Sequence, residues 1–277
     1  MTQDPTLADA LTLTALEGGL EAIISGAYSN GPSSLPPEAG SPFGGLLAAL
    51  SVQALRQGLN VSAPLRSLSV QYLAAARYGT PLTLRPQMLR AGRNVTYATV
   101  AGAQGERLTH HAAATFGADA PSESDIGILE QAPPGLDTLV SAPGLSGPMA
   151  PHFSHSIEYR FEDGPRIFSG RPAQDARERL WMRTRDGAPL DDVRLCYLLD
   201  ALYPPAWTAM GAPLLMTSVD LRYDILADPT PRTAPDGWAF FEYRLLDHGR
   251  GWSVDDAICW GSDGRPLAIA RQRRKVL

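Results

Sequence analysis

Cysteine is scarce in this sequence of 277 residues, and its two cysteines do not form a spaced framework. Cys196 and Cys259 each lie within a segment whose apolar residues recur periodically. Such cysteines are typical of buried thiols in a reducing compartment. We therefore predict no disulfide bond.

Targeting and anchoring signals are also missing. The stretch at residues 1–19 is acidic and lacks a basic region followed by an apolar core, so neither a signal peptide nor a membrane anchor is predicted. The formal net charge of -5 gives no general attraction to nucleic acid or to anionic membranes. These absences predict a cytoplasmic protein with no membrane span and no nucleic-acid partner.

Metal ligands are too few to suggest a metal site. His110 and His111 are adjacent, and His152 lies close to His155, but neither pair has a convincing third ligand in the sequence. Adjacent histidines on a strand also point to opposite faces of the sheet. We predict no metal and no other cofactor.

What the sequence does contain is an internal repeat. The stretch QMLRAGRNVTYATVAGAQGERLTHHAAAT returns as RLLDHGRGWSVDDAICWGSDGRPLAIARQ, and both look like β-hairpins. Leu89 aligns with Leu246, Gly92 with Gly249 and Arg93 with Arg250; after a two-residue insertion, Gly105 aligns with Gly264 and Leu108 with Leu267. A repeat of this length fixes the architecture, because each copy is one structural unit.

The segment between the two copies reads as a linker. It is rich in Pro, Gly, Ser and Ala, and residues 118–155 include neither Lys nor Arg. We therefore predict an N-terminal unit at residues 1–118, a linker at 119–149 and a C-terminal unit at 150–277. Each unit has the size of an ordinary domain.

Each half has an opening strand, one helix and a meander of strands. The helices are expected at residues 43–58 and 190–202. In the strand at residues 252–260, Trp252, Val254, Ile258 and Trp260 alternate onto one side. We expect this apolar side to pack against the helix, which the curved sheet then wraps.

This arrangement resembles the hotdog fold, and the tandem copy resembles the double-hotdog type II acyl-CoA thioesterases over most of the chain. The resemblance implies an α+β fold in which two helix-wrapped antiparallel sheets join into one continuous layer. It also places three site residues of that family: its aspartate on Asp200 in YLLDALYPP, its threonine on Ser218 in TSVDL, and its glutamine on Gln272 in AIARQRR. Asp200 would then activate water, and Ser218 and Gln272 would orient it.

The residues themselves support part of this assignment. Asp200 shares a helical stripe with Val193 and Cys196, so its carboxylate is either a buried general base or a helix-end residue that faces solvent. Gln272 is either a site residue or a glutamine at a sheet edge. Strand alternation groups Ser218 with the polar Asp220 and Arg222, on a face expected to be exposed.

Two glycines are candidates for stabilising an oxyanion. Gly44 and Gly45 begin the first helix, where free N–H groups and the helix dipole favour negative charge. The same glycines are also explained by close packing of the helix. Ser51 aligns with Asp200, so the first copy has no equivalent carboxylate and one site per chain is expected.

A basic run ends the sequence. Arg271, Arg273, Arg274 and Lys275 are candidate contacts for the phosphates of coenzyme A, with a solvated tail as the alternative. The predicted function is hydrolysis of acyl-CoA. A non-catalytic module that binds acyl-CoA is an alternative, and a hydratase is a weaker one because no helical Asp/His pair is evident. A homo-oligomer is compatible with the sequence.

Overall fold

The computed structural model describes residues 5–121, 127, 129–142, 145 and 147–277. Three α-helices lie within these residues, at α1 (Leu7–Ala10), α2 (Gly44–Leu59) and α3 (Asp192–Leu198). The strands of the first half are β1 (Thr14–Leu16), β2 (Gly19–Ile23), β3 (Leu65–Tyr72), β4 (Pro81–Ala91), β5 (Val95–Gln104) and β6 (Arg107–Gly117). Those that follow are β7 (Val140–Ala142), β8 (Ile157–Phe161), β9 (Arg177–Thr184), β10 (Met216–Ile225), β11 (Ala239–Gly249), β12 (Trp252–Trp260) and β13 (Pro266–Val276).

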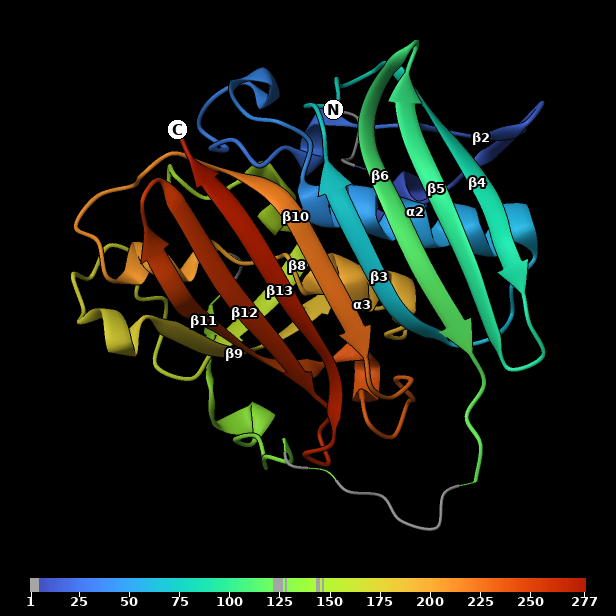
Figure 1. Cartoon of the computed structure of the whole chain (residues 1–277). Coiled ribbons are helices and arrows are strands. Elements are labelled where there is room, and N and C mark those ends of the chain that lie inside the picture. The colour runs from blue at the N-terminus through green and yellow to red at the C-terminus, as the bar shows by residue number, and fades with distance from the viewer. Residues whose placement is uncertain (1–4, 122–126, 128, 143–144, 146) are drawn as a thin grey trace.

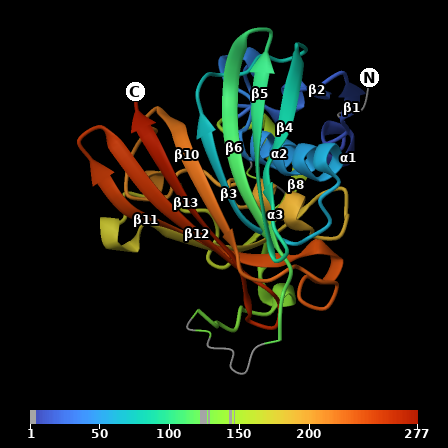
Figure 2. The ribbon, with the colours of Figure 1, turned by 45° about the vertical axis from the view of Figure 1, so that its right-hand side comes forward.

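The described strands form a single antiparallel sheet of 13 strands, in the order β1-β2-β4-β5-β6-β3-β10-β13-β12-β11-β9-β8-β7. The two halves meet where β3 pairs with β10, with Val70 opposite Leu221. Both long helices lie on the same side of this sheet (Figure 1), and the turned view shows the sheet curving around them (Figure 2). The α+β double hotdog with one continuous layer is confirmed.

The helices differ in length for local reasons. Helix α2 is almost entirely buried over its first three turns, as its run of Leu and Ala requires. Helix α3 begins as expected, because the Asp191 side chain accepts a hydrogen bond from the Arg194 N–H at 2.7 Å. It ends at Leu198, earlier than predicted, ahead of Pro204 and Pro205.

The repeat extends to the irregularities of the strands. A β-bulge between Met88 and Arg90 in the first half is matched by one between Leu245 and Asp247 in the second. The β5/β6 and β12/β13 pairs share a second bulge, which aligns Leu108 with Pro266. The alignment of Leu108 with Leu267 was therefore wrong by one residue. Matching the glycines of the two turns does not show where a bulge adds a residue to the strand that follows.

The apolar side of β12 faces the opposite way from the expectation. Ala257 and Cys259 join the core around the helices. Ile258 and Trp260 instead form a second cluster on the outer face, with Trp181, Trp238 and Phe240. Alternation identifies two faces but not which one is inside, and here large apolar residues occupy both.

Part of the predicted linker covers this second cluster. The Trp181 indole donates a hydrogen bond to the Pro134 carbonyl at 3.0 Å, and the Trp260 indole donates one to the Leu129 carbonyl at 2.6 Å. Residues 122–126, 128, 143–144 and 146 of that segment lie outside the described residues. The domain boundaries stay a prediction.

Both cysteines are buried, as predicted. Helices of the described chain are all too short or too polar to span a bilayer.

Candidate active site

Asp200 lies in the turn that follows α3 and is only 7% exposed. The carboxylate rests against the start of α2: a Cβ atom added to Gly44 would lie 2.8 Å from Asp200 Oδ2. The Tyr72 hydroxyl packs at the same glycine and donates a hydrogen bond to the Gly44 carbonyl at 3.0 Å. A solvent-facing aspartate is therefore excluded, and the carboxylate sits where the two halves meet.

The surroundings of Asp200 favour a proton acceptor that works near neutral pH. Burial raises the pKa of its carboxyl to about 6, in spite of the lowering effects of the Arg274 charge and of hydrogen bonds from the Gln272 side chain and the Gly45 backbone. The negative charge of Asp255 adds to the increase in pKa. A base with this pKa is ionised at neutral pH and still binds a proton well.

Ser218 and Gln272 are brought together by a bulge. On β10 the register with β13 shifts between Ser218 and Asp220, so the two residues do not follow simple alternation. The shift places Ser218 on the helix side of the sheet with Leu221, which is opposite Gln272. The Gln272 Nε2 atom donates a hydrogen bond to Ser218 Oγ at 2.6 Å. The grouping of Ser218 with Asp220 was wrong, because the bulge could not be read from the sequence.

The two glycines of α2 differ in what they permit. Gly44 leaves room for the Asp200 carboxylate and the Tyr72 ring. At Gly45, an added Cβ would lie 2.7 Å from the Tyr197 carbonyl of α3 and would overlap the Phe43 ring. Gly45 therefore allows the close approach of the two helices, and its backbone N–H also bonds to Asp200. The packing explanation therefore applies to Gly45, and the oxyanion role of Gly44 and Gly45 stays a prediction.

The four basic residues at the C-terminus do not act as one group. Arg271, Arg273 and Lys275 lie on the outer face of β13, where Arg271 pairs with Asp256 at 2.7 Å and Lys275 donates to the Gly251 carbonyl at 3.0 Å. Arg274 lies on the helix side and its side chain is 11% exposed. Strand alternation separates it from the other three.

Sequence reasoning missed the pair that Arg274 forms. The Arg274 Nε atom donates to Asp255 Oδ2 at 2.6 Å, and its Nη2 atom donates to Gln272 Oε1. The β12/β13 ladder places Asp255 opposite Gln272. Finding this pair requires the strand register and the inner face of β12, and the sequence alone gives neither.

The first half holds no copy of this polar group. The same bulge recurs between Leu65 and Ser67, so the register places Leu65, Ala114 and Phe116 where the second half has Ser218, Gln272 and Arg274. All three are buried in the apolar core. Ser51, aligned with Asp200, bonds to the buried His110 at 3.1 Å. The polar group thus occurs once in the described chain.

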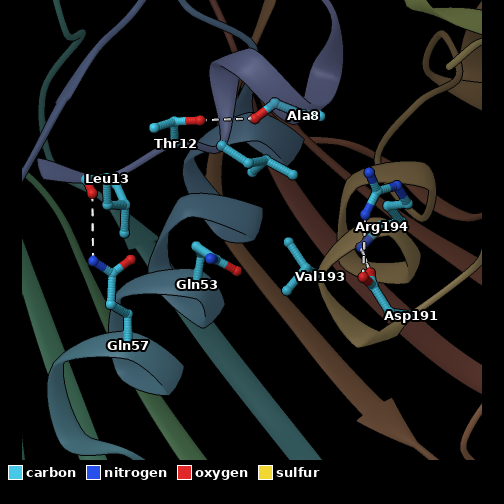
Figure 3. Close-up of a pocket in the computed structure, with 9 residues that line it drawn as sticks. Ala8, Thr12, Leu13, Gln53, Gln57, Asp191, Val193 and Arg194 are labelled. Atoms are coloured by element: carbon cyan, nitrogen blue, oxygen red, sulfur yellow. Dashed lines mark hydrogen bonds and ion pairs between the residues drawn. The ribbon is translucent and has the colours of Figure 1, made fainter. Parts of the chain in front are cut away.

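A separate groove lies on the other side of the helices. It has a volume of about 460 Å³ and is enclosed by the N-terminal segment and by the flanks of α2 and α3, including Thr12, Gln53, Gln57 and Arg194 (Figure 3). Asp200, Ser218 and Gln272 do not line it. Over the part of the chain that is described, no cluster of three or more metal-ligating side chains occurs.

Comparisons with solved structures agree with the fold. A hot dog fold protein of unknown function from Alicyclobacillus acidocaldarius is 22% identical, with a TM-score of 0.86 over 98% of this chain and 97% of the other. The acyl-CoA thioesterase II TesB2 of Mycobacterium marinum is 17% identical, with a TM-score of 0.73 over 98% of both chains. The TesB protein of Mycobacterium avium subspecies paratuberculosis is 15% identical, with a TM-score of 0.76 over 98% of both.

Family models give the more specific result. No curated protein is a significant match to the sequence. The model of the acyl-CoA thioesterase N-terminal domain matches residues 32–117, and that of the acyl-CoA thioesterase C-terminal domain matches residues 131–273. The C-terminal match includes Asp200, Ser218 and Gln272. With both halves of the chain matched in order, this protein belongs to the acyl-CoA thioesterase family.

Proposed function

We propose that the protein hydrolyses acyl-CoA to a free fatty acid and coenzyme A, with water activated by Asp200. One observation carries the proposal: a buried carboxylate with a pKa of about 6 lies beside a glutamine, a serine hydroxyl and a helix N-terminus. Such a set can hold water, take its proton and stabilise an oxyanion.

In the proposed reaction, the water oxygen attacks the thioester carbonyl carbon while its proton passes to Asp200. The tetrahedral intermediate then expels the coenzyme A thiolate, which takes up the proton that Asp200 received from the water. Gln272 donates hydrogen bonds to Asp200 and to Ser218 Oγ. Because the Ser218 oxygen is the acceptor in this bond, its own proton can be donated to another group. We assign that proton to the water or to the substrate carbonyl. Fixing the water in this way lowers the entropic part of the barrier.

The oxyanion is assigned to the N-terminal end of α2. The Gly45 N–H already contacts the Asp200 carboxylate, so the Gly44 N–H is the first candidate donor. The helix dipole adds a favourable field for developing negative charge. Base and donor would then come from different halves of the chain.

Substrate binding is assigned to the outer basic residues. Arg271, Arg273 and Lys275 would meet coenzyme A phosphates, whereas Arg274 is held in a buried ion pair with Asp255. A cytoplasmic location in fatty acid metabolism fits this substrate and the two buried thiols.

The test is thiol release from a panel of acyl-CoAs of graded chain length, with Asp200→Asn as the main variant. Loss of a general base is expected to lower kcat by about 100- to 10,000-fold while acyl-CoA binding persists. Gln272→Ala should cost less, because Gln272 orients water without taking its proton. Parental hydrolysis by Asp200→Asn would refute the mechanism.

Two other outcomes correspond to the alternatives. Acyl-CoA binding without thiol release by the unaltered protein would assign it as a non-catalytic module. Hydration of an enoyl-CoA in a parallel assay would assign it as a hydratase.

A further inference from the structure

The ion pair behind Gln272 controls how its amide is oriented. Arg274 has only donors, so its contact with Gln272 requires the amide oxygen to face Arg274. The amide nitrogen is then left to face Ser218 Oγ, 2.6 Å away, and Asp200. A flipped amide would bring two donors together at Arg274 and an acceptor to the Asp200 carboxylate. The orientation therefore depends on Arg274.

Asp255 fixes Arg274 in turn. Its Oδ2 atom accepts from Arg274 Nε at 2.6 Å, and its Oδ1 atom accepts from Ser253 Oγ at 3.3 Å. The side chains of Asp255 and Arg274 are 5% and 11% exposed, so the pair is shielded from solvent. Burying two charges is costly, and replacing such a pair with apolar residues is often neutral or stabilising in proteins. Stability alone is therefore a weak reason for its presence.

We propose that Asp255 and Arg274 are positioning residues, which act on the reaction by holding the Gln272 amide in the orientation that donates to Asp200 and Ser218. This inference rests on the proposed thioesterase function and deepens it. It also replaces the prediction that Arg274 binds a phosphate of coenzyme A.

The pair sets the electrostatics of the base in opposing ways. The Arg274 charge lowers the pKa of Asp200, and the Asp255 charge raises it. Three buried tyrosines lie within the electrostatic influence of Asp200, and burial raises the pKa of each, so they stay neutral: Tyr72 on β3, Tyr223 on β10 and Tyr243 on β11. Changes in the Asp255 and Arg274 charges therefore have a defined sign.

The kinetic test compares Arg274→Met and Asp255→Asn with the unaltered protein. Both variants should lower kcat by about 10- to 100-fold with little change in KM, because neither residue touches substrate. Arg274→Met should move the acidic limb of the pH profile to higher pH, and Asp255→Asn should move it to lower pH. Arg274→Lys keeps the positive charge and protects folding; it should lose kcat with a smaller shift of the limb.

The chain supplies a matched control on the same two strands. Asp256 is as buried as Asp255 and also bonds an arginine of β13, Arg271, but on the outer face. Asp256→Asn should leave kcat and the acidic limb in place. If Arg274→Met and Arg274→Lys instead changed KM and its salt dependence with kcat preserved, Arg274 would be a phosphate contact and the positioning role would be wrong.

A second readout does not depend on hydrolysis. The side-chain amide signals of Gln272 in an NMR spectrum, assigned by their loss in Gln272→Ala, should titrate with a midpoint near pH 6 as Asp200 ionises. Arg274→Met should raise this midpoint and Asp255→Asn should lower it. Unmoved midpoints would overturn the positioning role even in an active enzyme. Shifted midpoints in a protein that releases no thiol would overturn the proposed function alone.

Discussion

Gly44→Ala is the smallest change that reaches the base without altering any polar group. The added Cβ would lie 2.8 Å from Asp200 Oδ2, and 3.1 and 3.2 Å from the Oη and Cζ atoms of Tyr72. These three nearest atoms all belong to side chains, which can move more easily than backbone. The backbone φ of Gly44 is negative, which leaves steric overlap as the main cost.

The size of the effect follows from these distances. Ordinary contact begins at 3.4 Å, so the carboxylate must retreat by about 0.6 Å, the difference between 3.4 and 2.8 Å. A displacement of about 1 Å can cost about 100-fold in rate, and 0.6 Å therefore predicts a loss in kcat on the order of 10-fold. Overpacking costs about 1–3 kcal/mol and the gain in helix propensity returns up to about 1 kcal/mol, so a modest loss of stability is expected.

The assay is thiol release under saturating acyl-CoA, with urea unfolding to measure stability. Gly211→Ala is the control, since a Cβ added there meets nothing within 4 Å. It should retain the parental kcat. A Gly44→Ala protein with parental kcat and a native unfolding curve would show that the position of Asp200 does not limit the reaction, and the assignment of the base would fail.

The remaining predictions concern pH, the basic tail and the halves of the chain. Because Asp200 must be ionised to act as a base, kcat/KM should rise with pH through about 6 and then level off, which a pH profile measures. Folding raises the pKa of Asp200 from 3.8 to about 6, so the protonated carboxyl stabilises the fold. This stabilisation is complete below pH 3.8 and is lost as the pH rises through about 6. The unfolding free energy of Asp200→Asn, relative to that of the parent, should therefore increase by up to about 3 kcal/mol between about pH 4 and about pH 8, as measured by urea unfolding. The same difference between variant and parent at the two pH values would contradict the raised pKa of Asp200. Neutralising Arg271, Arg273 and Lys275 together should raise KM and reduce its salt dependence; an unchanged KM would assign them to solvent. Residues 150–277 expressed alone should aggregate or self-associate, because the edge of β10 is no longer paired with β3. Size-exclusion chromatography measures this, and a well-behaved monomer would count against the pairing of the two halves through β3 and β10.

The fold was readable because it depends on patterns that repeat. Two helical segments and two copies of a glycine-marked hairpin were enough to place a helix against a curved sheet in each half. The predictions that failed concern the local geometry of the strands. A bulge adds one residue without changing the composition of a strand, so the face of Ser218 and the exact alignment of Leu108 could not be derived.

The site was only partly readable for a similar reason. Asp200 stood out because it is a carboxylate among apolar residues, and its burial agrees with that signal. Asp255 and Arg274 gave no such signal, since one lies in an acidic pair and the other in a basic run. Deciding which member of each run points inward requires the register of three strands, and that register is a tertiary property.

The shared bulge at Leu65 and Ser218 has a consequence for how the chain could be redesigned. The kink that presents the serine is also present in the half without a site, where it carries a leucine. It is therefore a feature of the scaffold, and chemistry occupies only one of its two instances. The N-terminal half offers an engineer a preformed strand geometry in which Leu65 and Ala114 stand at the serine and glutamine positions. At the position of Arg274 that half has Phe116, so it lacks the charged side chain that contacts the glutamine.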